Sequence, residues 1–265
     1  MSLLTHEPFL RLAAFALVFA SFAFWEASAP RRLRTLDRSQ RWPGNLGVFA
    51  IDTLLVRVLF PTAAVGFALY AAARGWGLLG HAGLPAWLEI VATVLVLDLA
   101  IYAQHVLFHR VPALWRLHRM HHADLELDVT TGVRFHPIEI LLSMLIKLGV
   151  IAALGAHPAG VLIFEVLLNA TSMFNHANAS MPRRLDAILR RIVVTPDMHR
   201  VHHSIVRAET DSNFGFNLPW WDRLFGTYRA QPAAGHDGMT LGIERFRSVR
   251  ELRLDRMLAQ PFRSG

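Results

Sequence analysis

Five apolar stretches alternate with polar and charged segments along the 265-residue chain. They cover about residues 9–24, 46–73, 87–107, 138–156 and 159–174. A helix that crosses a membrane needs about 20 mainly apolar residues, a length that the second and third stretches reach comfortably. The last two are shorter, and Gly155, Pro158 and Gly160 lie between them, which predicts a tight helical hairpin that enters and leaves on one side or reaches only part of the way across. The pattern predicts an all-α fold: a multi-pass membrane helical bundle of about three spans plus a helical hairpin.

The composition supports the membrane class. The chain is 53% hydrophobic and only 18% charged, and its mean hydropathy is +0.33. Soluble globular domains carry about 25% charged residues, so an ordinary soluble domain is excluded. The length allows a single membrane domain over residues 1–265, without room for a separate electron-transfer module.

The first stretch has two interpretations. Ala27-Ser28-Ala29 is similar to the small-residue cleavage site of a signal peptide. The segment before the stretch is only weakly basic, and Pro30 directly after the site should hinder cleavage. We therefore expect an uncleaved membrane anchor.

Positive charge predicts the topology. The formal net charge is +7 and Lys147 is the only lysine; its place in the hairpin favours snorkelling to a headgroup. Arginines cluster beside apolar stretches, which fits anionic lipid headgroups better than nucleic acid. One basic loop follows the first stretch, and a second basic segment lies downstream: Arg31, Arg32, Arg34, Arg38 and Arg41, then Arg183, Arg184, Arg190 and Arg191. Basic loops stay in the cytoplasm, so residues 110–135 and everything from residue 176 onward are expected on the cytoplasmic side.

Histidines form three clusters. The chain has no cysteine, so a metal would be held by His, Asp or Glu. The clusters are H-x-x-x-H at the end of the third span, H-x-x-H-H just after it, and a second H-x-x-H-H downstream: His105 and His109; His118, His121 and His122; His199, His202 and His203. Positions i, i+3 and i+4 share one face of a helix, so each cluster can aim two or three imidazoles at one point. We expect a cytoplasmic, His-rich helical region that caps the bundle.

Chance does not explain these motifs. With 14 histidines in 265 residues, one H-x-x-H-H is expected about 0.04 times, and the chain has two. A lone histidine is more often a satisfied core or surface residue, but eight clustered imidazoles predict a metal centre. They exceed the need of one tetrahedral zinc ion and suit two metals. Imidazole binds Zn, Cu, Fe and Ni, so ligand type alone does not choose the metal.

Other polar residues lie in the apolar stretches. Asp98 is on the third span, and Glu165 precedes His176 by eleven residues on the fifth stretch. Polar residues within a membrane usually face the bundle interior, so Asp98 and Glu165 either orient metal-binding imidazoles or make helix–helix hydrogen bonds. His176 is a candidate further ligand. His136, where the chain re-enters the membrane, either binds metal or positions a helix start.

The order of the three motifs resembles the eight-histidine signature of the fatty acid hydroxylase/sterol desaturase superfamily. The surroundings are similar too: Asp128-Val129-Thr130-Thr131, Arg134-Phe135-His136-Pro137, Asn175-His176-Ala177-Asn178 and Trp221-Asp222-Arg223-Leu224-Phe225-Gly226-Thr227. The resemblance covers about residues 90–230 and is specific for the superfamily, not for a substrate. It implies a catalytic region there, with a di-iron centre on the cytoplasmic face.

The resemblance also implies the site's composition. It makes eight histidines catalytic iron ligands: His105, His109, His118, His121, His122, His199, His202 and His203. His176 is implied as a ninth ligand. Some relatives carry another histidine where this chain has Ser172, so the number of ligands on one metal is open. Two iron ions are the implied cofactor, O2 the co-substrate and a bilayer lipid the substrate. We expect no built-in haem or cytochrome b5, and hence a separate electron donor of ferredoxin, cytochrome b5 or reductase type.

The expected function is oxidation of a C–H bond in a fatty acyl, sterol or isoprenoid lipid by an integral-membrane monooxygenase, with hydroxylation preferred. Desaturation by the same centre stays open. So does a membrane zinc hydrolase, although it would need a general base beside its ligands and no H-E-x-x-H motif is present. A non-catalytic metal- or lipid-binding protein on this scaffold is the third alternative. The arginine- and alanine-rich composition favours a bacterial inner membrane, and the oligomeric state stays open.

Overall fold

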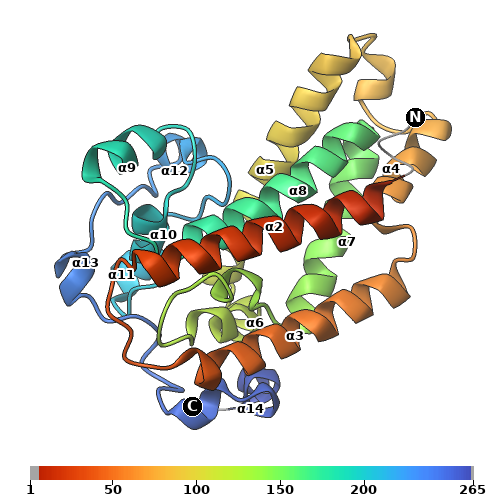
Figure 1. The fold of residues 1–265 in the computed structure, drawn as a ribbon. Coiled ribbons are helices and arrows are strands. Elements are labelled where there is room, and N and C mark those ends of the chain that lie inside the picture. Colours follow the sequence, from red (N-terminus) through yellow and green to blue (C-terminus); the bar gives the residue numbers. More distant parts are fainter. Residues whose placement is uncertain (1–5, 264–265) are drawn as a thin grey trace.

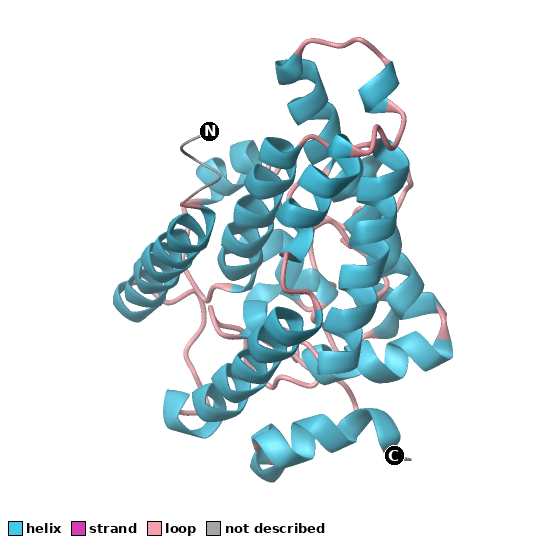
Figure 2. Ribbon diagram, turned by 90° about the vertical axis from the view of Figure 1, so that its right-hand side faces the viewer, coloured by secondary structure: helices cyan, strands magenta, loops and turns pink. Residues whose placement is uncertain are grey.

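The computed structural model describes residues 6–263, and this part of the chain is all-helical (Figures 1 and 2). The long helices are α2 (Glu7–Ser28), α3 (Arg38–Leu59), α4 (Ala63–Ala73), α5 (Ala86–Arg110), α6 (Pro112–His122), α7 (Pro137–Leu154) and α8 (Pro158–His176). The short ones are α9 (Arg183–Leu189), α10 (Pro196–His202), α11 (Arg207–Thr210), α12 (Trp220–Leu224), α13 (Gly235–Gly238) and α14 (Leu254–Ala259), with 3-10 turns η1 (Leu79–His81), η2 (Thr131–Val133), η3 (Val249–Leu252) and η4 (Gln260–Phe262). Two isolated β-bridges tie loops together, Pro30 to Ala179 and Ser204 to Leu241.

Four helical segments of the described chain are long and apolar enough to cross a membrane. They are Phe9–Ser28, Arg38–Ala73, Ala86–Arg110 and Pro137–Leu154. Large apolar side chains point outward from them; Leu17 is 69% and Phe24 73% exposed. In water such a surface would be costly, whereas lipid tails are as apolar as the side chains themselves. The chain is thus a membrane protein with the helical bundle that its apolar stretches predict.

The second apolar stretch forms two helices rather than one. Helix α3 ends at Leu59 and α4 begins at Ala63. Pro61 lacks an N–H group and disfavours helical geometry at the residue before it. Ala63 itself has a positive φ of 49°. The break lets α4 turn away from the line of α3 and pack against α7 and α8.

The predicted hairpin is formed by α7 and α8. Gly155 ends α7 in the left-handed conformation, with φ 67° and ψ 47°, which glycine adopts at low cost. A Cβ atom on Gly155 would meet the main-chain oxygen of Trp76 at 2.4 Å. Pro158 then starts α8 at a position where a missing N–H costs nothing. Helix α8 returns between α2, α4 and α5 and brings His176 to the far end of the bundle.

An ion triad joins helices α2, α7 and α8. The ammonium group of Lys147 on α7 donates to Glu165 Oε1 on α8 at 2.6 Å, and Arg11 on α2 binds the other carboxylate oxygen. Only 11% of the Lys147 side chain is exposed. The expectation that Lys147 snorkels to a headgroup was therefore wrong, because a closer carboxylate satisfies its charge.

The polar part of the chain gathers at one end of the bundle, opposite the α4–α5 connection (Figure 1). The basic loop after α2 packs into this cap. Arg31 binds Asp197 and Asp237, Arg38 binds Glu26, and Arg41 is fully buried between two aspartates. The expectation that the clustered arginines face lipid headgroups is therefore wrong for Arg41, because two aspartates neutralise its charge inside the protein.

Candidate metal centre

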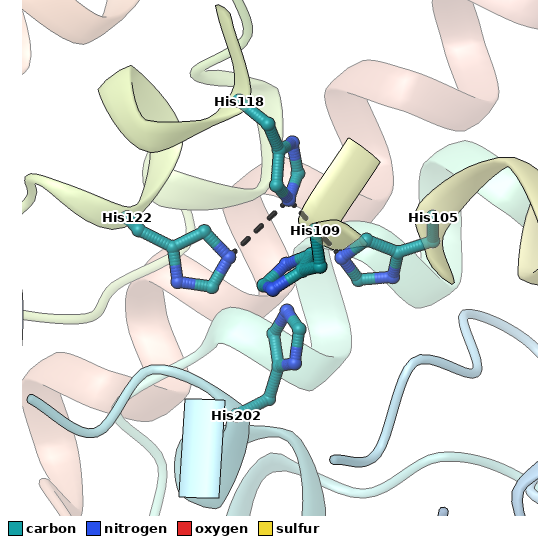
Figure 3. Close-up of side chains that lie close together, drawn as sticks. All are labelled: His105, His109, His118, His122 and His202. Carbon is teal, nitrogen blue, oxygen red and sulfur yellow. Dashed lines mark hydrogen bonds between the residues drawn. The ribbon is translucent and has the colours of Figure 1, made fainter. Parts of the chain in front are cut away.

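Nine buried histidines form two adjacent groups at the capped end of the bundle. The first group is His105, His109, His118, His122 and His202, and the second is His121, His176, His199 and His203. Within each group, one ring nitrogen per residue lies within 4.8 Å of the corresponding nitrogens of the others. Figure 3 shows the five rings of the first group pointing toward one another from α5, α6 and α10.

Helical spacing divides the motifs between the two groups. On α6, His118 and His122 are four residues apart and belong to the first group, while His121 turns to the second. The downstream motif reverses this division, since His199 and His203 join the second group and His202 the first. At about 100° per residue, i and i+4 lie only about 40° apart around the helix, whereas i+3 and i+4 lie about 100° apart, so the i+3 ring can point to the neighbouring group from the same broad face. Each H-x-x-H-H motif thus serves both groups.

Hydrogen bonds orient six of the nine rings. In four of them, Nδ1 lies 2.6–3.0 Å from a main-chain oxygen: His105 with Phe214, His121 with Arg134, His176 with Ser172 and His202 with Ser212. Two others face carboxylates, His118 with Glu139 at 2.7 Å and His109 with Asp211 at 3.2 Å. A carbonyl or ionised carboxylate only accepts, so each Nδ1 carries the proton and donates it. The lone pair is then on Nε2, the atom that faces the group.

The Nε2 atoms converge closely. His118 Nε2 lies 3.1 Å from that of His105 and 3.2 Å from that of His122, and His176 Nε2 lies 3.1 Å from those of His121, His199 and His203. The Nε2 atoms of His109 and His202 are buried and have no hydrogen-bond partner in the described chain. Lone pairs that face one another repel unless a cation lies between them, and nitrogens bound at about 2.1 Å to one ion are roughly 3.0–3.4 Å apart. The residues therefore fit two metal ions.

The protonation state of the rings agrees with metal binding. Burial, followed by the charges of neighbouring imidazoles, lowers the pKa of His121, His122 and His203 well below its usual range. The same causes, burial first, lower the pKa of His199 and His202. These imidazoles are thus neutral at neutral pH, as a metal ligand must be.

The structure does not bring every predicted residue to the centre. His136 belongs to neither group: it caps α7, where its Nδ1 accepts from Ile138 N at 3.2 Å and its Nε2 donates to Leu258 O at 3.2 Å. Its helix-start role is the one the geometry supports. Asp98 accepts from Trp221 Nε1 at 2.8 Å, and Glu165 holds the ion triad, so neither carboxylate orients a histidine as the sequence allowed.

Two carboxylates that orient rings were missed at the sequence level. Glu139 lies in the first turn of α7, three residues after His136, and an acidic residue at that point of a membrane helix was the available signal. Nothing in the sequence marked Asp211 as a partner of His109, because only the fold brings α11 beside α5. Both carboxylates strengthen the donor character of the imidazole they bind.

A buried charge network supports the loop between the first H-x-x-H-H motif and α7. Arg41 donates to Asp124 at 2.7 and 2.8 Å and to Asp128 at 2.5 Å. Burial would raise the pKa of Asp124, but the guanidinium groups of Arg41 and Arg134 outweigh it and hold the pKa well below its usual range. Asp124 is therefore ionised, and the loop is tied to α3 by charge-assisted hydrogen bonds.

The fold and the site define a class: an all-helical membrane protein with two adjacent all-histidine metal sites at one end of its bundle. The sequence profile described as fatty acid hydroxylase matches residues 90–227. This region contains all three motifs and His176. The chain belongs to the fatty acid hydroxylase family.

Characterised relatives are similar over the same part of the chain. Ornithine lipid hydroxylase OlsE of Rhizobium tropici is 34% identical over 148 residues, 56% of this chain and 44% of the relative. Human alkylglycerol monooxygenase is 27% identical over 58% of this chain and 33% of the relative. Rat cholesterol 25-hydroxylase is 27% identical over 54% of this chain and 48% of the relative. The similarity thus spans less than half of each relative. No solved structure gives a significant match.

Proposed function

We propose that this chain is a di-iron monooxygenase that hydroxylates a C–H bond of a membrane lipid. The observation that carries the proposal is the pair of buried imidazole groups, five and four histidines, at the end of a membrane bundle. All nine donors are neutral nitrogen atoms in two adjacent sets. Such a centre suits two divalent ions, one in each set.

The choice of iron rests on the donor set and on the relatives. The five nitrogen donors of the first group exceed the four that a structural zinc ion takes, and zinc has no redox chemistry. The relatives are named as hydroxylases and a monooxygenase. Two bound iron ions would supply the electron exchange that O2 reduction and C–H oxidation require.

The residues of the chain prepare the site for this chemistry. Six Nδ1–H donors fix the ring tautomers and leave Nε2 free to bind a metal. The carboxylate of Glu139 makes His118 a stronger donor, and that of Asp211 does the same for His109. Burial of all nine rings excludes bulk water, which limits side reactions of the oxidant.

A membrane lipid is the proposed substrate class. The relatives are named for ornithine lipid, alkylglycerol and cholesterol, all of them lipids. Their names favour hydroxylation over desaturation. Electrons would come from a separate donor. The basic loop after α2 and the arginines of α9 lie at the capped end. Because basic loops stay in the cytoplasm, this charge supports a centre on the cytoplasmic side, at the inner membrane if the source is a bacterium.

Metal analysis is the direct test. The protein would be purified in detergent from cells grown on enriched 57Fe and examined by Mössbauer spectroscopy. We expect about two iron ions per chain with a coupled diferric signal. Stoichiometric zinc without iron, even after anaerobic reconstitution with ferrous ion, would contradict the oxygenase and support a hydrolase or a non-catalytic protein.

The activity is tested by comparing lipids from cells that express the protein and its variants. The wild-type protein should add one oxygen atom to a lipid. The His202→Ala variant should abolish this product and lower bound metal, because one nitrogen donor is removed. His81→Ala is the matched control, since His81 is exposed and lies outside both groups. An unchanged product with His202→Ala, or a product that lacks two hydrogens in place of the added oxygen, contradicts the assignment.

A further inference from the structure

Two phenylalanines touch both histidine groups. The ring of Phe135 stacks on His121 at 4.5 Å with an interplanar angle of 10°, and lies 6.3 Å from His118. The ring of Phe216 lies 5.1 Å from His105 and 6.0 Å from His199. Each ring therefore meets one histidine of the first group and one of the second. No other phenylalanine, tyrosine or tryptophan of the described chain contacts histidines of both groups.

The remaining aromatic contacts belong to the first group alone. Trp115 lies 4.9 Å from His109 and 5.4 Å from His122, and the guanidinium of Arg207 covers its ring at 4.9 Å. Phe214 packs against His105, His109 and His202 at 5.1–5.5 Å. A charged group thus covers the Trp115 side of the centre. A hydrocarbon chain would gain little there, because it would displace a polar surface.

Phe135 and Phe216 instead continue into the apolar core of the membrane bundle. Phe216 belongs to the same cluster as Leu97 and Ile101 of α5 and Met144 of α7, and Phe135 packs against that cluster. The two rings lie 6.4 Å apart. Phe216 is 8% exposed and Phe135 is half-buried. The pair, which we name the Phe135–Phe216 wall, lies between the histidine centre and the apolar cluster that residues of α4, α5, α7 and α8 form.

We propose that the Phe135–Phe216 wall is where the hydrocarbon chain of the lipid substrate meets the centre, and that these two rings set which carbon is oxidised. That a lipid is oxidised here rests on the proposed function. That the lipid chain meets the centre at these two rings rests on their positions in the structure. A chain that approaches between α5 and α7 exchanges contacts with lipid for contacts with Ile101, Met144 and the two rings. These contact residues are apolar, so the chain would displace no hydrogen bond of theirs, whereas an approach through the cap would displace polar contacts.

The first experiment measures binding and does not require turnover. The detergent-purified protein is irradiated with a fatty acid that carries a diazirine at its chain terminus, and the labelled peptides are mapped by mass spectrometry. Label is expected on peptides that contain Phe135, Phe216, Ile101 or Met144. Phe216→Trp, which fills the path, should lower this label several-fold while the bound metal stays unchanged. Equal labelling of the variant, or label confined to the α2 or Trp115 side, would overturn the proposal.

The second experiment measures the position of oxidation. Phe135→Leu and Phe216→Leu remove ring volume beside the centre, so the oxidised carbon should shift along the chain or become a mixture. Phe67→Leu is the matched control, because Phe67 packs against the same apolar cluster but lies on α4 at the other end of the bundle (Figure 1). An unchanged product position in both wall variants would reject the wall. Label at the wall without any lipid oxidation would instead reject the proposed function and leave the binding path standing.

Discussion

The main-chain oxygen of Arg134 accepts the Nδ1 proton of His121 at 3.0 Å. The side chain of the same arginine donates to Met120 O at 2.9 Å and to Asn45 Oδ1 at 2.8 Å. One residue therefore holds a ring of the second histidine group and ties it to helix α3. This links the metal centre to a helix that lies outside the region matched by the family profile.

Arg41→Ala should destabilise the protein strongly. The change leaves the buried carboxylates of Asp124 and Asp128 without their shared guanidinium, and loss of one partner of a buried ion pair costs about 3–5 kcal/mol. Thermal unfolding in detergent would measure the loss, and metal content should fall with it because the loop positions His121. Arg57→Ala is the control on the same helix, since Arg57 is exposed. Equal unfolding temperatures for the two variants would contradict the network's role.

Glu139→Gln should weaken metal binding without unfolding the chain. The variant keeps the shape of the side chain but loses the negative charge that accepts the His118 Nδ1 proton at 2.7 Å. Loss of such a partner typically lowers metal affinity about 10–100-fold. Competition with a chelator would measure the affinity, and Glu244→Gln, at an exposed position, provides the control. Metal retention equal to that of the control would show that Glu139 does not act on the centre.

His176 and His136 should behave oppositely when each is replaced by alanine. His176→Ala removes the ring whose Nε2 lies 3.1 Å from three other imidazoles, so the second site should lose its metal. His136→Ala removes a helix cap, which costs roughly 0.5–2 kcal/mol of stability, and should leave both metals bound. Metal analysis with thermal unfolding separates the two effects. If the His136→Ala variant loses metal at a temperature where it is still folded, His136 is a metal ligand after all.

Acid should destabilise the protein partly through His236. Burial lowers the pKa of this residue to about 4, against the opposing charge of Asp197. The folded protein therefore binds fewer protons than the unfolded chain between pH 6.5 and about 4. The stability associated with neutral His236 is complete above pH 6.5 and is lost as the pH falls toward 4.

The His236→Gln variant isolates this effect. Its unfolding temperature should fall less than that of the wild-type protein between pH 6.5 and 4, and the difference between the two curves removes the contribution of all other groups. Parallel curves for the two proteins over this range would show that His236 does not carry the effect.

The sequence by itself determined the class of fold and the histidines that the structure gathers into two groups. Apolar stretches of spanning length predicted the membrane bundle, and Gly155 with Pro158 predicted the hairpin, because both signals are local to a helix or a turn. The H-x-x-H-H spacing predicted converging imidazoles for the same reason: residues three and four apart meet on one helix whatever surrounds it. The break at Pro61 was also local, and a proline within an apolar stretch could have revealed it.

Only the tertiary structure decided how these residues are used. The assignment of His121 to one group and of His118 to the other depends on where α5, α8 and α10 arrive around α6. His105 and Phe214, whose contact fixes a ring, are 109 residues apart in the sequence. The roles of Glu139, Arg41 and the Phe135–Phe216 wall likewise arise from long-range packing. Local spacing sets which side chains share a face, but the partner that each face meets depends on how distant helices bury their apolar surfaces and pair their buried charges.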